Sequence, residues 1–106
     1  MSARAVRPRR KPITGAERRQ AIVESLADDE QVIFYDGFDD AITGLTEMQP
    51  SRNQRLVTYD YDKLVRCCRQ QGMTEDEAVE YLEFNTIGAW VGELTPIVVR
   101  VLRIER

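Results

Sequence analysis

The sequence of 106 residues contains no histidine and only two cysteines. The absence of histidine excludes Ser-His-Asp triads, Cys-His catalytic pairs and His-ligated zinc. The cysteines, Cys67 and Cys68, are adjacent, and neighbouring side chains on a helix point about 100° apart, which makes them a poor disulfide pair. Any enzymatic chemistry would therefore depend on carboxylates, lysine, tyrosine or cysteine, and a reducing, cytoplasmic setting is expected.

Long apolar runs and nucleotide-binding motifs are also missing. No stretch approaches the ~18 apolar residues that a membrane span requires. The N-terminal segment lacks the apolar region of a secretory signal peptide. Neither a Gly-rich phosphate loop nor a dinucleotide-binding fingerprint is present. We therefore expect no membrane association and no cofactor.

Charge is distributed unevenly along the chain. Residues 1–19 carry seven basic side chains and one acidic one, a net charge of +6, whereas residues 20–106 carry eight basic and 17 acidic ones, a net charge of −9. Segment 1–13 has two prolines and no apolar periodicity, so we predict a basic, disordered arm before a single domain at 14–106. The acidic body would repel DNA, but the arm is suited to weak, sequence-independent binding of nucleic acid or of an acidic partner. The cations of the arm are Arg4, Arg7, Arg9, Arg10 and Lys11.

Local capping signals predict three helices. Two S/T-x-x-E capping boxes, at 14–17 and 74–77, mark the starts of two of them. The first helix is expected over about 15–27, and the other is expected to reach about 85, with an extension to Gly92 left open. Between them, Asp60 or Asp62 caps a helix that runs to about 71, where Gly72 closes it.

Four segments rich in β-branched and aromatic residues predict strands at 31–35, 41–46, 55–59 and 97–102. Both faces of segment 31–35 are apolar, which favours a central strand, and a turn at Asp36-Gly37 follows it. Residues 49–53 are predicted to form a loop. The order of elements indicates an α+β fold, with a small and mostly antiparallel sheet of three to four strands packed on two to three helices.

Five aspartates gather in two motifs, FYDGFDD at 34–40 and YDYD at 59–62. One interpretation assigns them to turns and helix caps. A second makes them an acidic and aromatic surface for a basic partner, formed by Asp36, Phe38, Asp39, Asp40, Asp60 and Tyr61. A third makes them ligands of catalytic metal ions, contributed by Asp36, Asp39, Asp40 and Asp60. We expect some of these acids to be caps and turns and the others to face a partner.

Three motifs resemble a family of small proteins common in bacteriophage genomes and in phage-like bacterial genes. They are FYDGFDDAITG, YDYDKLV and MTEDEAVEYLEFNTIGAWVGELTPIV, and the resemblance covers about residues 31–99. The family has no assigned activity, so no catalytic residue carries over. The resemblance implies a cytoplasmic context and a mobile-element origin.

The preferred hypothesis from the sequence is a non-enzymatic binding module whose acidic surface engages a basic site on a host or phage protein. One alternative is a small, metal-dependent phosphoesterase that uses the aspartates as ligands. Another alternative is a homo-oligomeric structural protein that buries Trp90 and the 97–102 strand between subunits.

Overall fold

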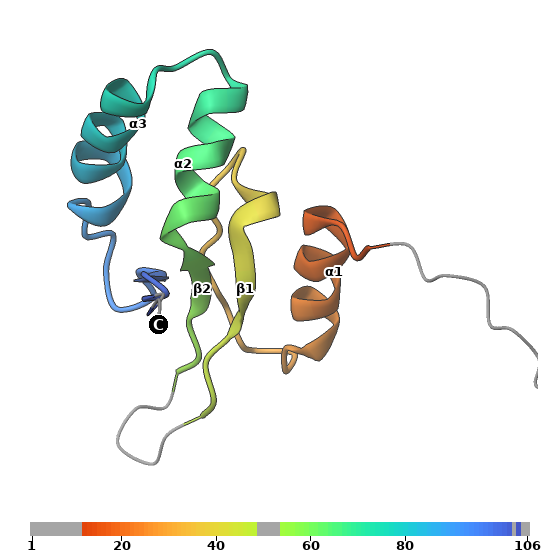
Figure 1. The fold of residues 1–106 in the computed structure, drawn as a ribbon. Coiled ribbons are helices and arrows are strands. Elements are labelled where there is room, and N and C mark those ends of the chain that lie inside the picture. The colour runs from red at the N-terminus through yellow and green to blue at the C-terminus, as the bar shows by residue number, and fades with distance from the viewer. Residues whose placement is uncertain (1–11, 49–53, 103, 105–106) are drawn as a thin grey trace, which may run out of the picture.

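The computed structural model describes residues 12–48, 54–102 and 104 (Figure 1). The predicted arm therefore lies outside the described residues except for positions 12 and 13, and the predicted loop at 49–53 lies outside them entirely. None of the described helices is long and apolar enough to cross a membrane.

The elements follow the predicted order with one exception. Helix α1 (Gly15–Ser25) precedes a 3-10 turn, η1 (Asp39–Ala41), and the strands β1 (Ile42–Leu45) and β2 (Val57–Asp60). Helices α2 (Tyr61–Gln70) and α3 (Glu75–Leu82) follow, then a π-helical turn, η2 (Glu83–Ile87), and strand β3 (Ile97–Val99). The strand order is β1-β2-β3, in which β1 and β2 are antiparallel whereas β2 and β3 are parallel. The α+β class is confirmed, and the sheet is mixed rather than mostly antiparallel.

The helix boundaries are set by the predicted caps. Thr14 and Thr74 each accept a hydrogen bond from the backbone N–H three residues later, at 3.1 and 3.2 Å. Asp60 caps α2 by accepting a hydrogen bond from the N–H of Asp62 at 2.9 Å. Gly72 closes α2 with a φ of +99°, a conformation that glycine adopts without steric cost. These local signals place the ends of the helices to within two or three residues.

The predicted strand at 31–35 is wrong. This segment forms no strand. The backbone N–H of Tyr35 donates to the hydroxyl oxygen of Tyr59 at 2.8 Å, and the two rings lie 4.9 Å apart. Val32 and Phe34 also pack against the core. Its apolar residues are therefore explained by burial against the sheet, without strand pairing.

The C-terminal elements are shorter than predicted. Helix α3 passes at residue 83 into the π-helical turn, which ends at Ile87, so the extension to Gly92 that the sequence left open does not occur. The N–H of Gly88 donates to the carbonyl oxygen of Glu83 at 2.8 Å, and a Cβ at position 88 would lie 2.2 Å from that oxygen. The turn therefore requires glycine at this position. Strand β3 ends at Val99, three residues before the predicted limit.

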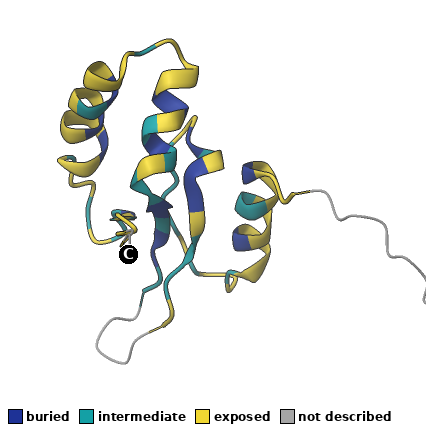
Figure 2. Cartoon of the chain, viewed as in Figure 1, coloured by how far each residue is buried: buried dark blue, intermediate teal, exposed yellow. Residues whose placement is uncertain are grey.

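The core lies between the sheet and the helices α2 and α3. Buried residues concentrate on β1, β2 and the facing sides of the two helices (Figure 2). The largest fully buried side chains are Tyr59, Ile42, Leu64, Leu82, Val57 and Cys68. On β2, Val57 and Tyr59 point inward while Thr58 points outward, where its hydroxyl contacts that of Thr43 at 2.6 Å.

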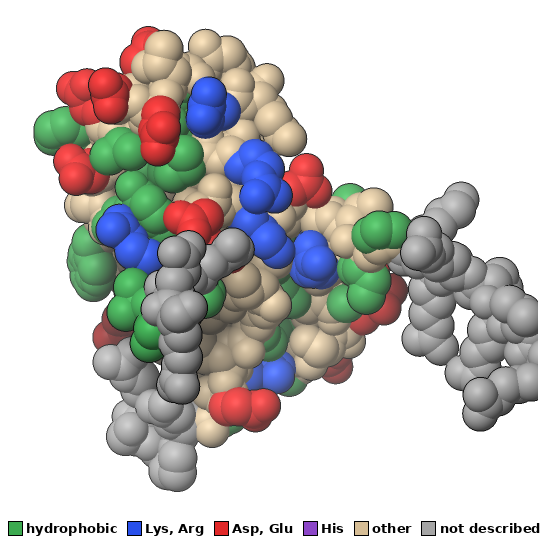
Figure 3. Space-filling view, viewed as in Figure 1, with side chains coloured by type: hydrophobic (Ala, Val, Ile, Leu, Met, Phe, Trp, Pro, Cys, Tyr) green, Lys and Arg blue, Asp and Glu red, His purple; other side chains and the backbone are tan. Residues whose placement is uncertain are grey.

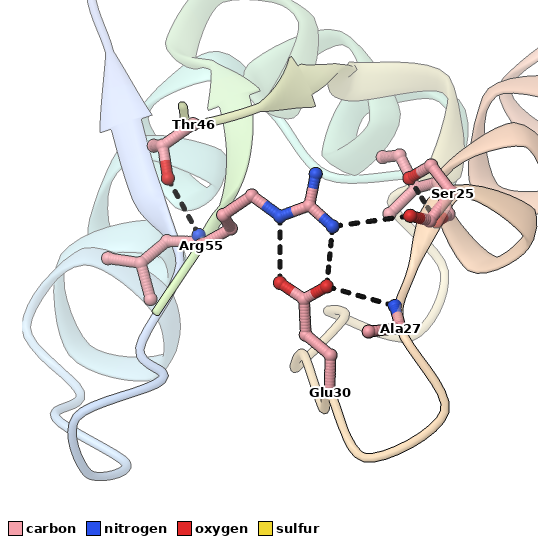
Figure 4. Close-up of polar contacts among 7 residues, drawn as sticks. Ser25, Ala27, Glu30, Thr46 and Arg55 are labelled. Atoms are coloured by element: carbon pink, nitrogen blue, oxygen red, sulfur yellow. Dashed lines mark hydrogen bonds and ion pairs between the residues drawn. The ribbon is translucent and has the colours of Figure 1, made fainter. Parts of the chain in front are cut away.

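One ion pair joins the segment that follows α1 to the segment that precedes β2 (Figure 4). The guanidinium of Arg55 donates to both carboxylate oxygens of Glu30, and the distance from its Nε to Oε2 is 2.7 Å. It also donates to the carbonyl oxygen of Ser25 at 3.2 Å. The Glu30 carboxylate also accepts the N–H of Ala27 at 3.1 Å. The hydrogen bond from Arg55, followed by that from Ala27, lowers the pKa of Glu30 to about 2.

Candidate functional site

Three of the five aspartates have structural roles. Asp60 caps α2, as described above. Asp40 accepts a hydrogen bond from the N–H of Gly15 at 3.2 Å and so holds η1 against the start of α1. Asp39 pairs with the guanidinium of Arg19 at 3.1 Å. Charge reversal at Asp39 or Asp40 would therefore disturb the fold as well as any binding surface.

The four aspartates considered as metal ligands do not converge. Asp36 and Asp39 lie near the same cation, with the Arg19 guanidinium 4.0 and 3.1 Å from their carboxylates. Asp40 faces a cleft between α1 and α2, and Asp60 lies at the start of α2. Within residues 12–48, 54–102 and 104, no group of three or more His, Cys, Asp or Glu side chains is placed to share a metal ion.

The two aromatic members of the predicted surface also differ from expectation. Phe38 is only 5% exposed, so it belongs to the core instead of projecting towards a partner. Tyr61 is half-buried, and the guanidinium of Arg100 lies 4.0 Å from its ring centroid. Of the six predicted residues, Asp36 and Asp39 lie near the same guanidinium, that of Arg19, whereas Asp60 and Tyr61 lie at the start of α2. Asp36 and Phe38 alone share a cavity.

That cavity has a volume of about 300 Å³ and separates segment 33–38 from α3, η2 and the residues that follow. Phe38, Tyr81 and Val91 contribute apolar walls, and the carboxylate of Asp36 stands at the margin with its side chain 98% exposed. The hydroxyl of Tyr35 donates to the carbonyl oxygen of Thr86 at 3.3 Å and ties the two walls together.

A second cavity, of about 360 Å³, continues along α3. It shares Tyr81 and Asn85 with the first cavity, and Phe84 also lines it. We call the two cavities together the α3–η2 groove. Its second half carries the carboxylates of Glu77 and Glu80.

Large apolar side chains stand exposed beside the groove. Phe84 is 73% exposed and Trp90 is 77% exposed, and Ile87 and Val91 are exposed as well. In the space-filling view, hydrophobic and acidic side chains gather together over α3 and the segment after it (Figure 3). Several large apolar side chains that stay exposed along one segment of a small domain are typical of a surface that contacts a partner.

The spacing of apolar residues in segment 78–91 is a sequence signal for this surface, which the acidic motifs do not indicate. Within 78–91, the buried positions are Ala78, Leu82 and Thr86, which recur every four residues. Phe84 and Ile87, three residues apart within η2, are exposed on another side of the same helical segment, and Val91 is exposed beyond its end. Apolar residues outside the buried stripe of a helical segment indicate a side that is available for a contact.

The groove is electrostatically negative at its margin. Glu77 accepts the N–H of Thr74 at 3.0 Å, and the hydrogen bonds from Thr74 lower the pKa of this carboxyl, which is therefore ionised at neutral pH. Glu80 and Asp36 are exposed carboxylates on the same margin. The arrangement suits a ligand that combines an apolar group with positive charge.

Comparison with known proteins identifies no relative: no family model, no curated protein and no solved structure matches the chain. The resemblance to small phage proteins therefore stays a prediction from the sequence.

Proposed function

We propose that the protein is a non-enzymatic binding module that holds a basic segment of a partner protein in the α3–η2 groove. The observation that carries this proposal is the exposed aromatic side chain of Phe84, which lines a groove with carboxylates on its margin; Trp90, also exposed, stands in the sequence between the lining residues Ala89 and Val91. Aromatic anchors of this kind contribute much of the binding energy at protein interfaces, and the rim charges select the partner.

The expected ligand is a short segment with a lysine or arginine next to an apolar side chain. The apolar side chain would enter the cavity between Phe38, Tyr81 and Val91, because that cavity has apolar walls. The cation would lie near Asp36 or Glu80. Since exposed charge pairs are screened by salt, ionic strength should affect the association rate more than the lifetime of the complex.

The cellular setting is part of the proposal. The sequence resemblance supports a phage or mobile-element origin, with a host or phage protein as the partner. The two cysteines, Cys67 and Cys68, are free and buried, which supports a reducing, cytoplasmic compartment.

The test is capture of the partner from lysate by matched variants of the tagged full chain. The groove variant combines Phe84→Ala with Glu80→Gln. The control combines Val23→Ala with Glu24→Gln on α1, which removes similar chemistry from an exposed surface elsewhere. We expect one near-stoichiometric protein that is captured by the wild type and the control and lost with the groove variant. Calorimetry with a basic peptide from that protein should then show the same order of affinities.

Equal capture by both variants, with both folded, would refute the groove as the binding site. Because Phe84 is mostly exposed, its truncation should change the free energy of unfolding by less than about 1 kcal/mol, so a lost interaction would not reflect unfolding. A wild-type chain that captures no protein at all would also count against the proposal.

A second candidate function is homo-oligomeric assembly, and β3 provides a specific observation in its favour. Ile97, Val99, Val101 and Leu102 are exposed on this C-terminal segment, and β2 is its one strand partner among the described residues. An exposed strand edge with apolar side chains readily pairs with another chain. Sedimentation equilibrium decides the matter: a monomer at tens of micromolar would exclude this function and leave the groove proposal intact.

A further inference from the structure

We propose that the cleft between α1 and α2 binds the phosphodiester backbone of a nucleic acid. The cleft is a cavity of about 330 Å³ on a different part of the molecule from the α3–η2 groove, and the two share no lining residue. Its cations come from both walls: Arg18 belongs to α1, and Lys63 and Arg66 belong to α2.

The three cations are not neutralised by ion pairs. Among the described residues, the ion pairs involve Arg19 and Arg55, and none involves Arg18, Lys63 or Arg66. One carboxylate, that of Asp40, also lines the cleft, and it accepts a hydrogen bond from the N–H of Gly15. The lining therefore carries a net positive charge, and a cleft lined by one sign of charge concentrates the field that attracts an anion.

The tertiary structure separates charges that the sequence counts together. Acidic side chains collect on α3 and η2, where positions 75, 76, 77, 80 and 83 are all Asp or Glu. In Figure 3, Lys and Arg side chains form a band from α2 towards α1, while Asp and Glu side chains gather over α3. Repulsion by the acidic side chains over α3 should be weak at this face, because salt screens exposed charges beyond about 8 Å at physiological ionic strength.

The arrangement of the cations favours a polyanion over a single phosphate. Lys63 and Arg66 are three residues apart on α2, so they project from the same side with a rise of about 4.5 Å between them. Gln70 extends this row by a further turn as a neutral hydrogen-bond donor. A row of donors facing a cation on the opposite wall matches a chain of phosphates.

The N-terminal arm is joined directly to this cleft. Ile13 and Thr14 line the cavity, and the five cations at positions 4–11 are connected to them through Pro12. Among the residues that the structure describes, no aromatic side chain lines the cleft, so these residues offer bases no stacking surface, and binding is expected to be independent of sequence.

The test is fluorescence anisotropy of a labelled oligodeoxythymidylate of about 20 nucleotides, titrated with the full chain at several salt concentrations. The cleft variant combines Lys63→Gln with Arg66→Gln. The matched control combines Arg55→Gln with Arg100→Gln, which removes two cations outside the cleft. The slope of log K against log salt is negative, and each lost contact with single-stranded phosphate reduces its magnitude by about 0.7.

We expect the magnitude of the slope to be about 1.4 smaller for the cleft variant than for the wild type. Near 50 mM salt, this difference corresponds to binding that is weaker by up to about 65-fold. The control should bind within about twofold of the wild type. A third variant, Arg9→Gln with Arg10→Gln and Lys11→Gln, measures the contribution of the arm separately. Circular dichroism melts confirm that each variant is folded.

Three results would overturn the proposal. The first is equal affinity of the wild type and the cleft variant, which would assign all binding to the arm. The second is an absence of binding by the wild type at about 50 mM salt. The third is binding of the wild type to phosphatidylglycerol vesicles without binding to the oligonucleotide, which would identify the anion as a lipid headgroup.

Discussion

The hydroxyl of Tyr59 offers a test of how the wall of the α3–η2 groove is held. Tyr59 is fully buried, and its oxygen accepts the backbone N–H of Tyr35 at 2.8 Å. The substitution Tyr59→Phe keeps the ring and its packing but removes that acceptor. The N–H of Tyr35 is then left without a partner in a partly buried position.

The magnitude follows from the cost of an unsatisfied buried donor. We expect the free energy of unfolding to fall by about 1–2 kcal/mol, the lower part of the range for such a group because Tyr35 is only half-buried. For a domain of this size the melting temperature should fall by roughly 4–16 °C. Urea denaturation measures the first quantity, and hydrogen exchange at the Tyr35 amide should accelerate at the same time. The control is Tyr61→Phe, whose hydroxyl has no hydrogen bond to a described residue.

The pH dependence supplies a second readout. Burial raises the pKa of Tyr59 from 10.0 to about 12. In the unfolded chain this phenol ionises near pH 10, while in the folded chain it stays neutral to about pH 12. The stability that burial of the neutral phenol contributes is thus present below pH 10 and is lost as the pH rises to about 12. The stability gap between wild type and Tyr59→Phe should narrow over that interval. A variant as stable as the wild type, with unchanged exchange at the Tyr35 amide, would refute the reasoning.

Three further predictions concern single positions elsewhere. Gly88→Ala should destabilise the chain by about 1–3 kcal/mol in urea titrations, since its Cβ would meet a backbone carbonyl oxygen; Gly44→Ala, whose Cβ would have its nearest neighbour at 4.0 Å, should be tolerated. Glu30→Gln should lower the melting temperature at neutral pH, because the carboxylate loses its charge pairing with Arg55. The difference in melting temperature between the wild type and this variant should shrink as the pH falls below 4.5, the ordinary pKa of an unfolded glutamate, and should be lost as the pH falls through about 2, the pKa of folded Glu30. Cys68, which is fully buried and whose pKa is raised by burial, should react with iodoacetamide only on unfolding, as followed by peptide mass spectrometry.

The α+β class and the helices could be predicted from the sequence because their signals are local. A capping box joins residues three apart, so Thr14 and Thr74 mark helix starts whatever the rest of the chain does. Gly72 marks a helix end for the same reason, since few other residues adopt a positive φ without strain.

The candidate site could be predicted only in part. Asp36 and Phe38 do lie at one cavity, but as a rim carboxylate and a buried wall. Asp39 lies near Asp36 but pairs with Arg19, and Asp40 and Asp60 accept backbone hydrogen bonds at helix starts, so these three carboxylates have structural roles. No count of acidic residues distinguishes a carboxylate that caps a helix from one that faces solvent.

The sequence by itself determined where helices begin and end, which chemistry the missing histidine excludes, and that charge is unevenly spread. The tertiary structure alone decided the strand pairing: segment 31–35 has strand composition, yet its Tyr35 N–H bonds to the Tyr59 hydroxyl. It also decided that Phe84 and Trp90 remain exposed and that Arg18, Lys63 and Arg66 meet across one cleft. These features depend on residues far apart in the chain, whose proximity is set by packing of the whole core.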